Sequence, residues 1–270
     1  MARLHAIKTS YRSKSIHIPS PFLTTTPPDA KPITFNQIDF ATSPLHEYKD
    51  HYAVVLDNVL SPSECDELLS LAEQSVEEPG DDPWKPALVN VGAGHEVLHT
   101  DYRNSDRIIW DNETVVSRLL SRCFQADGIK ERVSIIAGTQ CRTMLGKRAL
   151  DAGERWRIVK LNDRMRFLRY GKGQFFRPHC DGAYATETQR TFYTLHLYLN
   201  GPTDANPLRG GATTFWSSDE KRRVDVHPKT GSVLIFQHRG LLHSGDDVLE
   251  GIKYTMRSDI MYERDDIEEQ

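Results

Sequence analysis

The amino-acid sequence predicts a mainly β fold with flanking helices, of the double-stranded β-helix or jelly-roll class. From about residue 156 to residue 263, short strand patterns alternate with turn residues, as they do in jelly rolls. Two amphipathic helix patterns stand earlier in the chain, at 61–72 and 113–124. The third observation is a set of candidate metal ligands that needs more than one strand to bring it together: His179, Asp181 and His243.

The first predicted elements are a strand and a helix in direct succession. Residues 51–60, HYAVVLDNVL, have the composition of a β-strand. Ser61 then supplies a hydroxyl cap, Pro62 the first helical position and Glu64 an acid in the first turn. The apolar stripe of this helix consists of Leu68, Leu69 and Ala72.

The second predicted helix has apolar residues spaced for burial on one face: Val116, Leu119, Leu120 and Phe124. We expect both helices to support one sheet. The glycines of segment 90–99 do not follow a strand-to-helix pattern, so a nucleotide-binding loop is rejected there. Gly210, Gly211 and Gly231 stand at strand starts and are predicted to shape turns.

The segment 191–200, TFYTLHLYLN, predicts a strand with two chemically different faces. One face is polar and carries Thr194, His196 and Tyr198, because side chains two residues apart point to the same side. The opposite face carries Tyr193, Leu195, Leu197 and Leu199. The polar face either lines a barrel interior or meets solvent. The last strands are predicted from SVLIFQH at 232–238 and IKYTMRSDIMY at 252–262.

Composition narrows the class of protein. The chain has 270 residues and a formal net charge of -4, which gives no support for nucleic-acid binding. No apolar run approaches the roughly 18 residues that span a membrane. The four cysteines contain no CxxC pair, so we expect a reduced chain and an intracellular, cytoplasmic location. Cys180, between two candidate ligands, is predicted to be a packed thiol that points away from the metal.

Residues 1–45 are predicted to form a flexible N-terminal tail, and residues 46–270 a single domain. The first 28 residues contain no acid but several bases, and they are rich in Ser, Thr and Pro. A mitochondrial transit peptide shares this composition, so a mitochondrial location is the alternative.

The candidate ligands favour iron. In an extended strand His179 and Asp181 point to the same side and can bind one ion, and His243 must arrive on another strand. Two imidazoles and one carboxylate that leave positions open are typical of non-haem Fe(II) sites. Ten and fourteen residues beyond His243 stand Lys253 and Arg257, and a cation there can pair with the distal carboxylate of a dicarboxylate co-substrate.

With these residues the chain resembles the Fe(II)- and 2-oxoglutarate-dependent oxygenases, and among them the prolyl 4-hydroxylase-like branch. The resemblance covers roughly residues 53 to 263 and rests on six segments in order: LDNVLSPSECDELLSLA, RFLRYGKGQFFRPHCDG, FYTLHLYLN, GGATTF, VHPKTGSVLIFQH and HSGDDVLEGIKY. It implies Fe(II), 2-oxoglutarate and O2 as cofactors, with ascorbate as a further candidate. It also implies that the polar face of 191–200 lines the barrel.

The resemblance assigns roles to residues around the metal. Lys253 matches the cation that pairs with the C5 carboxylate of 2-oxoglutarate, with Arg257 as the alternative on the same strand face. Tyr198 matches a tyrosine whose hydroxyl bonds that carboxylate, and Tyr170 one that lines the co-substrate pocket. Thr255, between the two cations, could add a hydroxyl. For Arg103 and Arg107 the expectation is a solvent-facing position, with the mouth of the site as the alternative.

The predicted function is oxidation, by hydroxylation or a related reaction, of an unactivated C–H bond in a small or amino-acid-like molecule. A peptidyl prolyl hydroxylase is the first alternative, and a non-catalytic jelly-roll binding protein is the alternative of another class. The expected partner is therefore a small-molecule or peptide substrate, without nucleic acid or membrane.

Overall fold

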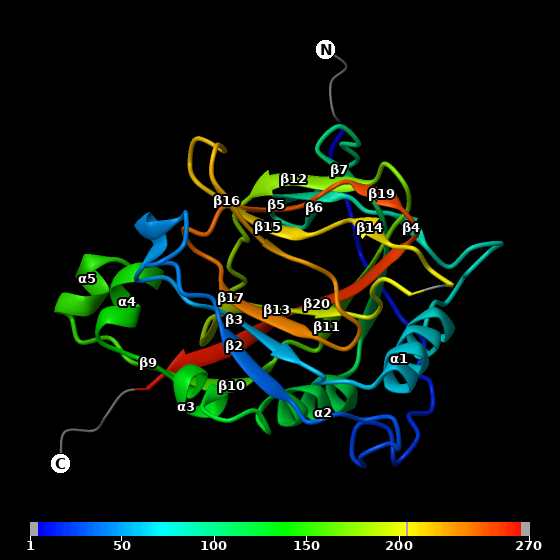
Figure 1. Ribbon diagram of the computed structural model, residues 1–270, viewed down its shortest axis with the longest axis horizontal. Helices are drawn as coiled ribbons and strands as arrows, with labels where there is room; N and C mark the ends of the chain where they lie inside the picture. The colour runs from blue at the N-terminus through cyan, green and yellow to red at the C-terminus, as the bar shows by residue number, and fades with distance from the viewer. Residues whose placement is uncertain (1–4, 204, 266–270) are drawn as a thin grey trace.

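The computed structural model describes residues 5–203 and 205–265, and two facing sheets dominate it (Figure 1). In order across the large sheet run β2 (Thr34–Gln37), β3 (Ala53–Asp57), β17 (Val233–Gln237), β13 (Gln189–Tyr198), β20 (Lys253–Arg264), β11 (Arg164–Tyr170), β8 (Asp106–Asp111) and β4 (Lys85–Pro86). The sheet also includes β10 (Trp156–Leu161), which pairs with β20, and β9 (Ile135–Ile136), which pairs with β10.

The smaller sheet lies across from the large one. Its strands are β16 (Arg223–Val226), β15 (Thr213–Trp216), β18 (His243–Gly245), β12 (Phe175–His179) and β7 (Arg103–Asn104). Two short additional sheets are β1 (Ile7–Lys8) with β6 (His95–Val97) and β5 (Val89–Gly92), and β14 (Arg209–Gly210) with β19 (Val248–Glu250). The arrangement is the predicted jelly roll, mainly β with flanking helices.

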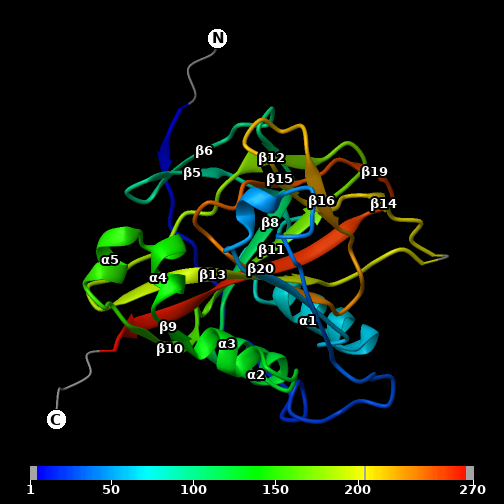
Figure 2. The same cartoon turned by 60° about the vertical axis from the view of Figure 1, so that its left-hand side comes forward.

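The predicted helices cover the outer face of the large sheet. They are α1 (Pro62–Gln74) and α2 (Glu113–Cys123), and Figures 1 and 2 show both on the side of the sheet away from β12 and β15. Leu68 of α1 and Leu119 of α2 belong to the same buried cluster as Leu195 and Leu197 of β13. The apolar face of 191–200 therefore packs toward the helices, as predicted.

Helix α1 begins as its sequence indicates. The Ser61 hydroxyl accepts a hydrogen bond from the Glu64 amide, and the Glu64 carboxylate accepts one from the Ser61 amide. This reciprocal capping box satisfies two amides that have no partner within the helix. The residue before the helix cap, Leu60, packs closely against Gly231, since a Cβ on Gly231 would lie 1.8 Å from the Leu60 carbonyl oxygen. Gly231 also has φ +73°, so its place at the turn requires glycine.

Three short helices were not predicted. They are α3 (Ile129–Ser134), α4 (Thr139–Met144) and α5 (Lys147–Asp151), and a 3₁₀ turn, η1, covers His46–Tyr48. Each helix spans at most six residues, too short for a repeated apolar period to be visible in the sequence. Among the described residues, none of the helices combines the length and apolar character needed to cross a bilayer.

The prediction of a flexible tail at residues 1–45 differs from the structure over residues 5–45, and residues 1–4 lie outside the described part of the chain. Phe22 and Leu23 are buried in the core that contains α1 and α2, and Phe40 and Leu45 are buried in a second cluster between the sheets. β2 pairs with β3 at the edge of the large sheet. The low hydrophobicity of the segment concealed these few anchoring residues, which are spread over a run of polar positions.

Candidate active site

The three predicted ligands lie together on the side of β12 and β18 that faces the large sheet. His179 ends β12, His243 begins β18, and the two residues are opposite each other in the antiparallel pair. Asp181 follows two residues after His179. Its Oδ1 is 3.7 Å from His179 Nε2, and its Oδ2 is 3.7 Å from His243 Nε2. One donor atom from each residue lies within 4.8 Å of the others, so the three can surround one ion.

Both histidines present Nε2 to this point because Nδ1 is occupied. His179 Nδ1 lies 2.8 Å from the Arg177 carbonyl oxygen, and His243 Nδ1 lies 3.0 Å from that of Leu241. A carbonyl oxygen only accepts, so Nδ1 carries the proton and the Nε2 lone pair is free. Burial lowers the pKa of His243 to about 4, which keeps this imidazole neutral. A metal requires that state of its ligand.

The Asp181 carboxylate is fixed on both oxygens. The Thr194 hydroxyl donates to Oδ2 at 2.6 Å, and Arg257 Nη1 forms an ion pair with Oδ1 at 2.9 Å. Burial by itself would raise the pKa of Asp181, but the Arg257 guanidinium together with His243 and His179 outweighs burial and holds this pKa well below its usual range. The carboxylate is therefore charged and oriented.

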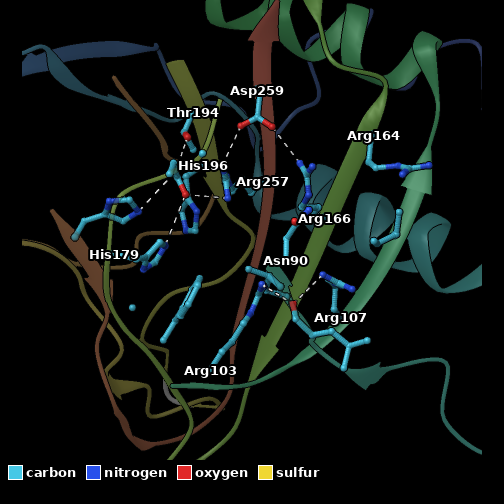
Figure 3. A pocket seen from close by; sticks show the side chains of 18 of the residues that line it. Asn90, Arg103, Arg107, Arg164, Arg166, His179, Thr194, His196, Arg257 and Asp259 are labelled. Atoms are coloured by element: carbon cyan, nitrogen blue, oxygen red, sulfur yellow. Dashed lines mark hydrogen bonds and ion pairs between the residues drawn. The ribbon is translucent and has the colours of Figure 1, made fainter. Parts of the chain in front are cut away.

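Arg257 is already bound to carboxylates. Besides Asp181 it donates to Asp259 Oδ1 at 3.1 Å. Asp259 also accepts from Arg166 at 3.1 Å, and Figure 3 shows Asp259 between the two arginines. Burial and two carboxylates leave this guanidinium little freedom to bind a further anion.

Lys253 has a different environment. Its side chain is 2% exposed, and its Nζ lies 5.3 Å from the centre of the Tyr170 ring and 5.7 Å from that of Tyr198. Burial lowers the pKa of Lys253 to about 8. A Cβ on Gly211, whose φ is +68°, would come within 3.1 Å of the lysine stem, so glycine makes room for it. Among the described residues, Lys253 forms no ion pair, in contrast to Arg257.

The remaining predicted co-substrate residues are Tyr170, Tyr198 and Thr255, and all three are buried. Tyr170 is buried and lines the cavity. Tyr198 is fully buried, and its hydroxyl lies 2.8 Å from the Thr213 hydroxyl, which lines the cavity. The Thr255 hydroxyl is buried and lacks a hydrogen-bond partner within the described part of the chain.

A cavity of about 590 Å³ joins the ligands and Lys253. Thr194 and His196 of β13 line it, so the polar face of this strand is interior, as the resemblance implied. His196 Nε2 is buried and has no partner in the described residues. Burial, followed by the Lys253 charge, lowers the pKa of His196 well below its usual range, so this ring is neutral.

Two expectations about neighbouring residues were wrong. Cys180 is exposed, because β12 ends at His179 and the thiol stands in the following loop. Arg103 and Arg107 are buried and line the cavity. Both donate to one oxygen, the carbonyl of Leu88, at 3.3 Å.

Other cavity residues were missed by the sequence analysis. Arg166 and Tyr170 share one face of β11 with Leu168, and this alternation could have placed Arg166 in the site. Glu96 and Asn90 come from the hairpin β5–β6, whose turn contains Ala93 at φ 51° and Gly94 at φ 74°. The Gly-Ala-Gly sequence at 92–94 was the available signal for that turn.

Residues 165–258 match the family model described as the 2OG-Fe(II) oxygenase superfamily. The matched segment is a 2OG-Fe(II) oxygenase domain. It contains all three candidate ligands and Lys253, and it gives the chain an oxidoreductase domain of the kind that uses Fe(II), 2-oxoglutarate and O2. No curated protein matches the chain.

Solved structures similar to this oxygenase include three prolyl hydroxylases. A viral collagen prolyl hydroxylase from Paramecium bursaria Chlorella virus-1, in complex with 2-oxoglutarate, is 18% identical with a TM-score of 0.44, over 77% of this chain and 95% of that one. A Pseudomonas putida prolyl-4-hydroxylase is 15% identical with a TM-score of 0.48, over 84% and 96%. A Trichoplax adhaerens prolyl hydroxylase, with a peptide fragment of hypoxia inducible factor, is 14% identical with a TM-score of 0.48, over 77% and 82%.

Proposed function

We propose that this oxygenase oxidises an unactivated C–H bond of a small, amino-acid-like molecule, with Fe(II) bound by His179, Asp181 and His243. Lys253 binds the C5 carboxylate of 2-oxoglutarate. The observation that carries the proposal is one cavity that holds a preformed ligand set beside a buried lysine that forms no ion pair with any described residue. When bound, iron and 2-oxoglutarate supply the O2-dependent oxidation, and the chain supplies orientation and the exclusion of water.

The side chains around the ligands have positioning roles. Thr194 and Arg257 fix the two oxygens of Asp181, so the carboxylate keeps its direction while the ion enters. The Phe176 ring stacks on His179 at 3.7 Å between ring centres, and the Phe236 ring packs edge-on against His243 at 4.7 Å. These rings hold the imidazole planes and keep water from their faces.

The walls of the cavity favour a small substrate. Thr9 and Tyr11 of the N-terminal segment line it, together with Asn90, Gly94 and Glu96 of the β5–β6 hairpin. Tyr11 donates to Glu96 and accepts from Arg107, so the N-terminal segment is attached to the hairpin at the cavity wall. We infer that an extended peptide would have to displace this wall, whereas a small molecule needs no such movement.

The test is succinate formation from 2-oxoglutarate with Fe(II) and O2. We expect the wild type to form succinate, and His179→Ala and His243→Ala to lose turnover and the binding of Mn(II) seen by electron paramagnetic resonance. The exposed His227→Ala is the matched control and should keep both. Full activity in either ligand variant would reject the assignment. Stimulation by prolyl peptides, without stimulation by small amino acids, would favour the peptidyl alternative.

A further inference from the structure

Cations outnumber carboxylates among the residues that line the cavity. Most of these cations have a carboxylate partner: Arg107 with Glu96, Arg164 with Asp111, Arg166 with Asp259, and Arg257 with Asp181 and Asp259. Within the described part of the chain, Arg103 and Lys253 have no carboxylate at ion-pair distance. The cavity is thus built with two cations that lack an anion.

Arg103 is the less expected of the two. It is 9% exposed, its Nη1 donates to the Leu88 carbonyl at 3.3 Å, and its buried Nε has no hydrogen-bond partner among the described residues. Burial lowers the pKa of Arg103 to about 10, and the charges of Arg107, Arg257 and Arg166 act in the same direction. The guanidinium remains protonated at neutral pH, and a bound anion would relieve both effects.

The position of Arg103 connects it to the metal ligands. β7 pairs with β12, where Arg103 stands opposite Phe176. The guanidinium carbon lies 4.7 Å from the centre of the Phe176 ring, and the same ring stacks on His179 at 3.7 Å. A group bound by Arg103 is therefore one side chain away from a ligand imidazole. Lys253 belongs to the opposite, large sheet, on β20.

A single 2-oxoglutarate would satisfy Lys253 through its C5 carboxylate. We propose that Arg103 binds a carboxylate of the molecule that is oxidised, so that the substrates are small carboxylic acids, amino acids with a free carboxylate among them. The planar guanidinium matches the two oxygens of a carboxylate, and its single charge matches a monoanion. This inference rests on the proposed function and adds the substrate class to it.

The experiment measures binding to the full chain loaded with Mn(II), which does not turn over, and saturating 2-oxoglutarate. The probes are four acids, L-proline, L-pipecolate, hexanoate and phenylacetate, each paired with its primary amide. Affinities are measured by isothermal titration calorimetry. For at least one pair we expect the acid to bind about tenfold or more tightly than the amide. Arg103→Met should remove this preference, and Arg103→Lys should retain part of it.

The matched control is Arg164→Met, because Arg164 also lines the cavity but is paired with Asp111. It should keep the preference for the acid. Should Arg103→Met fail to fold, as judged by circular dichroism, the several-fold loss expected for Arg103→Lys carries the test. The inference is overturned if no acid binds better than its amide, if the preference survives in Arg103→Met, or if it is undiminished in Arg103→Lys.

The affinity for 2-oxoglutarate separates this inference from the proposed function. It should change less than about threefold in Arg103→Met. A loss comparable to that of Lys253→Met would assign Arg103 to the co-substrate and overturn the substrate carboxylate. If the wild type with Mn(II) does not bind 2-oxoglutarate at all, the proposed function itself fails.

Discussion

Lys253 and Arg257 lie four residues apart on one strand, yet their surroundings give them different chemistry. Arg257 is held between Asp181 and Asp259, whereas Lys253 is buried against two tyrosine rings and forms no ion pair in the described residues. An uncompensated buried cation is costly unless a ligand supplies the charge. The co-substrate carboxylate therefore fits Lys253, and Arg257 fits the role of orienting a metal ligand.

Lys253→Ala should raise the KM for 2-oxoglutarate strongly. The reason is that losing a buried charge-assisted bond costs roughly 2–5 kcal/mol. The matched variant Arg257→Ala should instead weaken metal binding, because Asp181 loses its ion-pair partner. Steady-state kinetics with varied 2-oxoglutarate and a Mn(II) titration distinguish the two effects. An unchanged KM in Lys253→Ala together with a raised one in Arg257→Ala would reverse these roles.

The binding of 2-oxoglutarate should depend on pH through Lys253. Burial lowers the pKa of Lys253 to about 8, and only the protonated amine can pair with a carboxylate. Affinity should therefore be highest below pH 8 and fall by about tenfold per pH unit above it. The charge of Asp246 acts against burial and raises the pKa of Lys253. The two tyrosines that face the amine, Tyr170 and Tyr198, have their pKa raised by burial. Equilibrium titrations of Lys253→Arg, which stays charged, should show a flat profile; the same break in that variant would assign the titration elsewhere.

The cluster of candidate ligands could be predicted from the sequence because His179 and Asp181 are only two residues apart, although β12 ends at His179 and Asp181 stands in the loop after the strand. Arg103 could not, since its place depends on the pairing of β7 with β12, more than 70 residues away. The burial of Arg103 and the lack of an ion pair are properties of the assembled cavity. The exposure of Cys180 was missed for a smaller reason, namely that the strand ends one residue before it.

At the scale of the element, β13 joins the core to the site. Its alternation places Leu195 and Leu197 in the cluster that contains the helices, and Thr194 and His196 in the cavity. The two faces were predictable because a period of two leaves no choice once one face is apolar. That the polar face meets a cavity and not solvent is settled by the second sheet, which alternation alone does not reveal.

Leu197→Ala should destabilise the fold and leave the site in place. Leu197 is fully buried, so its truncation should cost about 2–5 kcal/mol of unfolding free energy. Urea denaturation measures this cost, and Leu249→Ala, at a side chain that is 52% exposed, is the control with a small expected effect. The affinity for 2-oxoglutarate should stay within about twofold at temperatures where the variant is folded. A large loss of affinity at unchanged stability would mean that Leu197 faces the metal.

At the scale of the whole molecule, the N-terminal segment connects the helix layer to the cavity. Arg118 of α2 donates to the carbonyls of Pro19 and Phe22 at 2.9 and 2.7 Å. Arg122 of the same helix donates to the Thr25 carbonyl at 2.9 Å. Tyr11, earlier in the segment, reaches the cavity wall. One stretch of chain thus packs against helix α2 and also forms part of the cavity wall.

Phe22→Ala should therefore be strongly destabilising, although the composition of residues 1–45 predicts a flexible tail. Phe22 is 4% exposed and belongs to the main core, so the loss should be about 3–5 kcal/mol in urea denaturation. Leu98→Ala, at a side chain that is 50% exposed, is the control and should change little. A chain that starts at residue 46 loses Phe22, Leu23, Phe40 and Leu45 together, and we expect it to lack cooperative unfolding. Native stability in that shortened chain would show that residues 1–45 are the flexible tail that their composition predicts.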